Sequence, residues 1–194
     1  MTPKRRGVLA VVSAGSGAGK STLCHTLLRR RRNLKFSISV TTRLPRPGER
    51  DGYDYFFVTD AAFKAMRQRK ELLEWADVHG YFYGTPRPFV ERALKSGQDI
   101  LLDSDVQGAL NVQKLYPRAV LIFITAPSFG EMERRLRARS SETERDIQRR
   151  LADARRELKS LPRYDYHVIN DSVPLAVRRL SAILDAESMR ILKA

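Results

Sequence analysis

A glycine-rich segment near the start of the chain constrains the fold more than any other feature of the sequence. It reads Ala14-Gly15-Ser16-Gly17-Ala18-Gly19-Lys20-Ser21 and follows residues 7–12, an apolar stretch short enough to be one buried strand. Residues 22–28 are typical of the first turns of a helix. A strand, a glycine-rich loop, Lys-Ser and a helix are the context in which this pattern binds phosphate.

This loop predicts a phosphate-binding site. Glycines let consecutive backbone N–H groups converge on phosphate oxygens, and the N-terminus of the following helix adds positive potential there. We expect the residues from Ala14 to Ser21 to bind ATP, with Lys20 reaching the β and γ phosphates and the Ser21 hydroxyl on Mg²⁺. The strict consensus begins with glycine, whereas this chain has Ala14; the alternative is a glycine-rich turn without a ligand.

Length and cysteine content define the broad class of protein. A chain of 194 residues is long enough for one domain with a full core. The one cysteine, Cys24, excludes an internal disulfide and a cysteine-rich metal site. The apolar stretch after the basic residues 4–6 is too short for a signal peptide, and no stretch approaches the length of a membrane span. We expect a cytoplasmic protein with no membrane partner.

The net charge favours anionic partners. It is formally +14, with a pI of about 10.4, which suits nucleotides or nucleic acid. Residues 29–32 end the first expected helix, where cations complement the helix dipole. A second set of arginines has few acidic residues between its members, so we expect phosphates to neutralise its charge. It consists of Arg134, Arg135, Arg137, Arg139, Arg145, Arg149 and Arg150. Because zinc-finger spacing, interleaved aromatic residues and a basic low-complexity tail are all absent from the sequence, we expect no nucleic-acid partner.

Strands alternate with helices along most of the chain. Apolar runs predict strands over residues 7–13, 99–103, 119–125 and 166–170. Apolar residues at helical spacing and end signals, including a capping box at Ser128 and Glu131, predict helices over residues 19–31, 128–139, 142–160 and around 177–184. This order predicts a three-layer α/β/α fold, with a parallel core sheet covered by helices on both sides.

Residues 39–89 interrupt this alternation. They are rich in proline, glycine and aromatic residues, with short strand-like pieces such as residues 53–58. One helix, over about residues 60–69, would carry Phe63 and Met66 inward. We interpret this segment as a small α/β lobe inserted beside the phosphate loop.

The inserted segment carries a second motif. Residues 39–49 read Ser-Val-Thr-Thr-Arg-Leu-Pro-Arg-Pro-Gly-Glu, and residues 52–57 read Gly-Tyr-Asp-Tyr-Phe-Phe. Combined with the phosphate loop, this pattern resembles the guanylate kinases, which transfer a phosphoryl group from ATP to GMP. The resemblance continues in order through residues 73–76, 83–85, 102–108, 135–139 and 164–171, so it covers nearly the whole chain.

The resemblance implies a fold, a division of the chain and a reaction. The fold is that of the P-loop NTPases, with a core of about residues 1–38, 90–134 and 151–194, a GMP-binding lobe of about residues 39–89 and a lid of about residues 135–150. The reaction is Mg²⁺-dependent transfer of the γ-phosphoryl group of ATP to GMP, and also to dGMP. Two alternatives are a P-loop kinase for another nucleotide or phosphorylated small molecule, and a related module that binds protein ligands.

The resemblance also assigns residues to the GMP phosphate. Arg43 and Arg46 would hold this dianion with charge-assisted bonds, and Tyr55 and Tyr83 would donate their hydroxyls to it. The alternative for the two tyrosines is a role as ordinary core aromatics.

Four further residues are implied at the guanine base. Guanine differs from adenine by its N1–H and 2-amino donors, so Glu74 and Asp105 would accept from them. Ser39 and Thr85 would bond the base around its O6 edge, and each of these residues has the alternative of being a surface polar group. A buried pocket of this kind rejects the wrong base because mismatched polar groups stay unpaired.

The ATP side is assigned in the same way. Asp103 ends an apolar strand and would help to organise Mg²⁺ through water or Ser21; alternatively it caps the next loop. Arg135, Arg139 and Arg150 would lie over the ATP phosphates and neutralise charge in the transition state. Asn170 would lie near the adenine, or would cap its strand. The expected catalytic residues are Lys20, Arg43, Arg135, Arg139 and Arg150.

Three residues depart from the family pattern. Gly15 stands where proline is usual, Ser104 replaces an apolar residue, and Ser140 replaces a glycine. None of these changes removes a side chain expected to contact a ligand.

Overall fold

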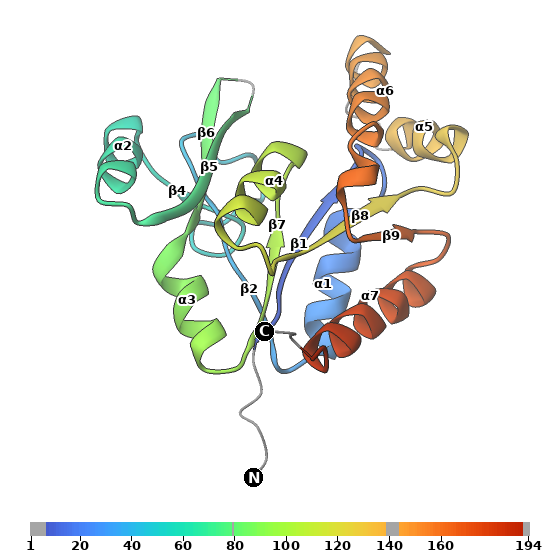
Figure 1. Cartoon of the computed structure of the whole chain (residues 1–194). Helices are drawn as coiled ribbons and strands as arrows, with labels where there is room; N and C mark the ends of the chain where they lie inside the picture. Colours follow the sequence, from blue (N-terminus) through green and yellow to red (C-terminus); the bar gives the residue numbers. More distant parts are fainter. Residues whose placement is uncertain (1–6, 79, 139–143, 192–194) are drawn as a thin grey trace.

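A parallel sheet forms the centre of the computed structural model, which describes residues 7–78, 80–138 and 144–191. Its strand order is β2-β7-β1-β8-β9 (Figure 1). The strands are β1 (Leu9–Ala14), β2 (Leu34–Phe36), β7 (Asp99–Asp103), β8 (Val120–Thr125) and β9 (Tyr166–Ile169). The strands expected from apolar runs therefore lie side by side, and the short β2 is added at the edge.

Helices cover both faces of this sheet. They are α1 (Lys20–Arg30), α3 (Arg87–Lys95), α4 (Val106–Leu115) and α7 (Val173–Ser188). Ala10 and Val12 of β1 pack with α1 and α7, whereas Leu9 and Val11 pack with α3 and α4 (Figure 1). Because successive strand residues point to opposite faces, a strand covered on both sides must be apolar at every position. The predicted three-layer α/β fold is confirmed.

A second, smaller sheet is built from the segment that interrupts the alternation. Its strand order is β4-β3-β6-β5, and helix α2 (Asp60–Gln68) lies beside it (Figure 1). The strands are β3 (Val40–Thr41), β4 (Phe56–Phe57), β5 (Leu72–Val78) and β6 (Tyr81–Pro86). Phe63 of α2 is fully buried against Val40 and Leu72, with Met66 partly buried. The strand expected over residues 53–58 is shorter, because Tyr53 and Asp54 lie in a turn closed onto the Arg50 carbonyl.

Two helices pack together at the opposite end of the main sheet from α2 (Figure 1). They are α5 (Phe129–Arg137) and α6 (Glu144–Leu158), followed by the short 3₁₀ helix η1 (Leu161–Arg163). The Ser128 hydroxyl accepts from the Glu131 N–H at 3.1 Å, so half of the expected capping box forms. The Glu131 carboxylate instead bonds Arg134 and Arg135, because charge-assisted bonds are stronger than neutral ones. Residues 142–143 of the expected helix lie outside the described residues.

The parallel arrangement brings the carboxyl ends of the strands to one edge of the sheet. The loops after β1, β7, β8 and β9 all start there, and ligands of open α/β sheets bind at that edge. Within residues 7–78, 80–138 and 144–191, no helix has both the length and the apolar composition needed to cross a bilayer.

Candidate active site

The loop between β1 and α1 has a backbone that requires glycine. Gly17 and Gly19 have φ angles of 84° and 85°, in the left-handed region that residues with a Cβ rarely adopt. The Ala18 N–H donates to the Gly15 carbonyl at 3.1 Å, which closes the turn. The loop therefore presents backbone N–H groups at the N-terminus of α1, where an anion is favoured.

Lys20 and Asp103 form an ion pair at this edge. Val12 and Asp103 are partners in the register of β1 with β7, which places the carboxylate beside the loop. The Lys20 ammonium also donates to the Ser104 carbonyl at 3.3 Å. Although burial disfavours the charged form, the Asp103 carboxylate raises the pKa of Lys20. Ser21 is exposed in the first turn of α1.

Asn170, which follows β9, and Arg135, on α5, support the loop. The buried Asn170 amide donates to the Ala18 carbonyl at 2.8 Å. Arg135 donates to the Asn170 carbonyl at 3.1 Å and pairs with Glu131 at 2.6 Å. A Cβ on Gly19 would lie 2.5 Å from the Asn170 amide nitrogen. This close approach, in addition to the left-handed φ angle, requires glycine at this position. The structure thus gives the Asn170 amide a partner in the loop itself.

The second basic group is Arg43, held inside the small lobe with 9% of its surface exposed. Its guanidinium donates to both Glu49 carboxylate oxygens, at 2.9 and 3.0 Å, and to the Tyr83 hydroxyl at 3.2 Å. The Tyr55 ring centroid lies 5.4 Å from the guanidinium carbon and 6.0 Å from the Tyr83 ring. The hydrogen bonds from Arg43 lower the pKa of Glu49. Glu49 is part of the motif of residues 39–49, but the sequence analysis assigns it no role. Its spacing of six residues from Arg43 is the only sequence signal for the pair.

A β-bulge aims Glu74 into the site. Leu72 pairs with Pro86 and Trp75 with Gly84, so β5 has one extra residue between these pairs. Leu72 packs in the cluster beneath α2, whereas Glu74 turns to the other face, where its carboxylate accepts from the Thr85 hydroxyl at 2.7 Å. Both side chains are buried, at 9% and 3% exposure.

Glu74 and Asp105 converge at Gly108. A Cβ on Gly108 would lie 3.1 Å from Glu74 Oε2 and 3.2 Å from Asp105 Oδ1. Asp105 is also the N-cap of α4, since Oδ1 accepts from the Gly108 N–H at 2.6 Å. Burial, together with the charge of Asp105, raises the pKa of Glu74 to about 7 against the Thr85 hydrogen bond. A buried acid, Glu74, beside a half-buried one, Asp105, forms a site for a ligand edge that carries hydrogen-bond donors.

The remaining expected residues lie around these groups. Arg46 is exposed, and its backbone N–H donates to Glu49 at 2.7 Å. Ser39 is half-buried, and its carbonyl accepts from the Phe56 N–H at 2.9 Å. Arg150 is half-buried on α6. Arg139 lies outside the described residues.

Magnesium fits the donors at the strand edge. Among the residues that the structure describes, no three His, Cys, Asp or Glu side chains could hold a metal by themselves. Mg²⁺ is usually held by one or two protein oxygens together with substrate phosphates and water. Ser21, the residue after Lys20, and Asp103, the ion-pair partner of Lys20, match that requirement.

The fold and the loop define a P-loop protein of the three-layer α/β class. Residues 6–187 match the family model described as guanylate kinase. Guanylate kinases of Desulfitobacterium hafniense and Caldanaerobacter subterraneus are 47% and 45% identical to the chain, over 97% and 98% of it and 94% and 93% of their own lengths. A crystal structure of guanylate kinase from Anaplasma phagocytophilum is 36% identical, with a TM-score of 0.80 over 96% of this chain and 89% of that one. The chain belongs to the guanylate kinase family.

Proposed function

We propose that this chain transfers the γ-phosphoryl group of ATP to GMP, with Mg²⁺ as cofactor. One observation carries the proposal. Asp103, paired with Lys20 of the phosphate loop, and Asp105, beside Glu74, are two residues apart at the end of β7. A triphosphate-binding loop and a pair of acids suited to guanine therefore adjoin each other.

GMP would be held at both of its ends. Glu74 and Asp105 accept from guanine N1–H and the 2-amino group, with Thr85 and Ser39 near the O6 edge. Arg43, Arg46, Tyr55 and Tyr83 bind the phosphate, and Glu49 and Tyr83 hold the Arg43 fork in orientation. Because these contacts go to base and phosphate, we expect dGMP to be accepted as well.

ATP would bind on the other side of Asp103. The loop from Ala14 to Ser21 surrounds its phosphates, Lys20 lies at the β and γ groups, and Arg135, Arg139 and Arg150 neutralise the charge that spreads in the transition state. Asn170 holds the loop through Ala18. Mg²⁺, held through Ser21 and, by way of water, Asp103, would supply charge neutralisation and alignment between the phosphates.

The reaction requires little proton transfer. The acceptor is a phosphate oxygen that is already anionic, so alignment, charge neutralisation and exclusion of water are what remain. We propose that the lobe of residues 39–89 and the lid of residues 135–150 close over the core of the chain to exclude water. We place this activity in the cytoplasm, which the single buried cysteine, Cys24, supports.

A coupled assay of ADP release across GMP, dGMP, AMP, CMP and UMP tests the proposal. We expect turnover with GMP and with dGMP, and loss of activity when Mg²⁺ is chelated. Conversion of another acceptor with GMP untouched would instead support a P-loop kinase of different specificity. No turnover with any acceptor, together with binding of nucleotides, would point to the binding-module alternative.

A further inference from the structure

The backbone of Ser104 connects the two halves of the proposed site. Ser104 lies between Asp103 and Asp105, directly after β7. Its N–H donates to the Val12 carbonyl at 3.1 Å, and its carbonyl accepts from the Lys20 ammonium at 3.3 Å. These two bonds hold the residue against β1 and the phosphate loop. The place of the Ser104 side chain is therefore set by the backbone, and its rotamer is the freedom that is left.

The Ser104 hydroxyl lies beside Gly108, in the first turn of α4. A Cβ on Gly108 would overlap the Ser104 Oγ atom. The same Cβ would lie 3.1 Å from Glu74 Oε2 and 3.2 Å from Asp105 Oδ1, so all three oxygens surround one point. Because glycine has no side chain, that point holds no carbon atom. A hydroxyl and two carboxylates therefore converge at the edge where the guanine base is proposed to bind.

Each of the two carboxylates already accepts a hydrogen bond from the protein. Glu74 Oε1 accepts from the Thr85 hydroxyl at 2.7 Å, and Asp105 Oδ1 accepts from the Gly108 N–H at 2.6 Å. A serine hydroxyl, by contrast, has one O–H donor and two lone pairs. With two carboxylates beside the Ser104 hydroxyl, its O–H is drawn towards one of them, and a lone pair remains for a ligand. Ser104 is half-buried, which leaves it accessible to that ligand.

The guanine base has more N–H groups than one carboxylate pairs with side by side. Its N1–H and its 2-amino group together carry three donors on one edge. The two oxygens of Glu74 suit N1–H and the nearer 2-amino N–H, as a carboxylate takes two neighbouring donors. The second 2-amino N–H is left for Asp105 and Ser104. The apolar residue that is usual at position 104 in the family pattern has no atom that could accept it.

We propose that Ser104 is a further specificity residue for GMP, an inference that rests on the proposed function. Its hydroxyl accepts the second 2-amino N–H of guanine together with Asp105. The contact forms only with a base that has this amino group, so it favours GMP over inosine monophosphate, the same nucleotide without the group. A site that hydrogen-bonds a substrate group rejects the analogue that lacks it, because the partner in the site stays unpaired.

Binding of the two nucleotides to the full-length protein tests the contact. Calorimetry at pH 8, above the Glu74 pKa of about 7, measures the dissociation constants with that carboxylate ionised. Ser104→Ala should weaken GMP binding about fivefold, the loss expected for one hydrogen bond, and should change binding of inosine monophosphate less than twofold. An equal loss for both nucleotides would assign the effect to the carboxylates or the fold. That result, or unchanged binding of GMP, would overturn the proposal.

Two variants of equal shape separate the hydroxyl of Ser104 from the volume of its side chain. Threonine keeps the hydroxyl, whereas valine has a methyl group in its place. Ser104→Thr should bind GMP about fivefold more tightly than Ser104→Val, because the hydrogen bond is the difference between them. Inosine monophosphate should bind both variants equally. Equal affinity of the two variants for GMP would overturn the proposal even if the Ala variant were weakened.

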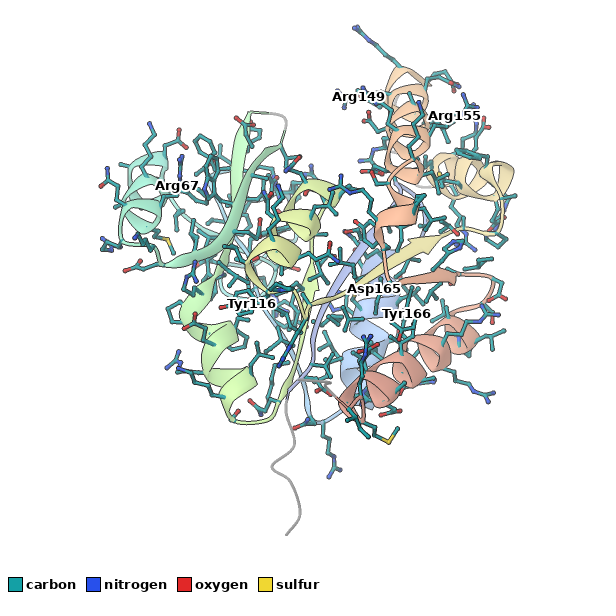
Figure 2. The ribbon with its side chains drawn as sticks, in the orientation of Figure 1. Arg67, Tyr116, Arg149, Arg155, Asp165 and Tyr166 are labelled. Atoms are coloured by element: carbon teal, nitrogen blue, oxygen red, sulfur yellow. The ribbon has the colours of Figure 1, made fainter. Side chains whose placement is uncertain are left out.

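A control variant and the wild type separate this result from a general effect and from failure of the proposed function. Tyr116→Phe removes a hydroxyl that donates to Glu91 at 3.0 Å, at the opposite end of α4 from Gly108 (Figure 2), and should leave both dissociation constants unchanged. Wild type that binds GMP without phosphorylating it, or that binds neither nucleotide, would reject the proposed function. Wild type that phosphorylates GMP, with Ser104→Ala equal to it in GMP binding, would reject the role of Ser104 alone.

Discussion

The Arg43 guanidinium and the Glu49 carboxylate form two hydrogen bonds, of 2.9 and 3.0 Å, inside the small lobe. Pairs of this planar, two-bonded kind fix orientation as well as charge. The guanidinium also meets the Tyr83 hydroxyl at 3.2 Å, so its direction is set before any substrate arrives. We expect a site organised in this way to bind a phosphate with little loss of side-chain entropy.

Replacement of Arg43 should weaken GMP binding strongly. Arg43→Ala is expected to raise the KM for GMP about a hundredfold, since charged hydrogen bonds are worth about 1.5–3 kcal/mol each. Arg43→Lys should restore little, because an ammonium cannot bond Glu49 and Tyr83 together in one plane. Steady-state kinetics at varied GMP measures both. Arg69→Ala removes an exposed arginine that is likewise paired through two bonds with Glu71, and should leave the KM for GMP unchanged; an equal rise there would show a nonspecific charge effect.

Replacement of Lys20 should affect turnover rather than folding. Lys20→Ala is expected to lower kcat at least about a hundredfold, because the developing charge on the phosphates loses the half-buried Lys20 cation. Rapid-quench measurement of a single turnover reports the chemical step, and circular dichroism reports the fold. Lys35→Ala, on the exposed side of β2, is the matched control. Near-normal kcat in Lys20→Ala would contradict the role of Lys20 in neutralising charge on the phosphates.

The affinity for GMP should depend on pH through Glu74. Its pKa of about 7 means that below pH 7 the carboxyl carries a proton that must leave before guanine N–H groups can be accepted. The dissociation constant for GMP should therefore rise by up to about tenfold per unit as the pH falls below 7. Fluorescence of Trp75, the one tryptophan in the sequence and the next residue to Glu74, provides the titration. The dependence should disappear in Glu74→Gln and persist in Glu157→Gln, which removes another carboxyl whose pKa burial raises to about 7. Its persistence in Glu74→Gln would assign it to another group.

Glu74 should also lower the stability of the ligand-free protein at neutral pH. The pKa of Glu74 is raised in the folded state, so below about pH 4.5 the carboxyl is protonated in both the folded and the unfolded chain and costs no stability. The free energy of unfolding then falls as the pH rises from about 4.5 to about 7. Glu74→Gln should then be more stable than wild type by about 2 kcal/mol at pH 8, and no more stable at pH 4. Urea unfolding at both pH values measures this difference. A variant less stable at pH 8 would show that the carboxylate is held by favourable contacts.

Asp99 should contribute to stability and not to catalysis. It is fully buried at the edge of the sheet away from the site, accepts from the Val8 N–H at 3.0 Å and lies 3.7 Å from Arg31. Asp99→Ala should cost about 3 kcal/mol of unfolding free energy, because it leaves buried partners unmatched. Asp185→Ala removes the exposed partner of Arg31 and should cost less than about 1 kcal/mol. Chemical denaturation gives both values, and unchanged KM values for the Asp99 variant would confirm the separation.

The sequence predicted most of the framework because its signals are local. The glycine-rich loop, the apolar runs of β1, β7 and β8, and the spacing in α7 each depend on neighbours within a few residues. They were enough for the fold class and the family, both of which are confirmed. The strands of the small lobe were placed poorly, because a bulge at Glu74 and a turn at Tyr53 break the period of two on which strand prediction depends. The roles of the individual site residues stay predictions.

Contacts between distant segments were decided by the tertiary structure alone. The convergence of Glu74 and Asp105 on Gly108 and the hydrogen bond from Asn170 to Ala18 leave no local pattern in the chain. The sequence by itself determined which segments become strands, helices and a phosphate loop, since periodicity and glycine conformation act at short range. Which acids become buried neighbours, and hence which pKa values move, depends on how those segments pack, because desolvation and charge act through space.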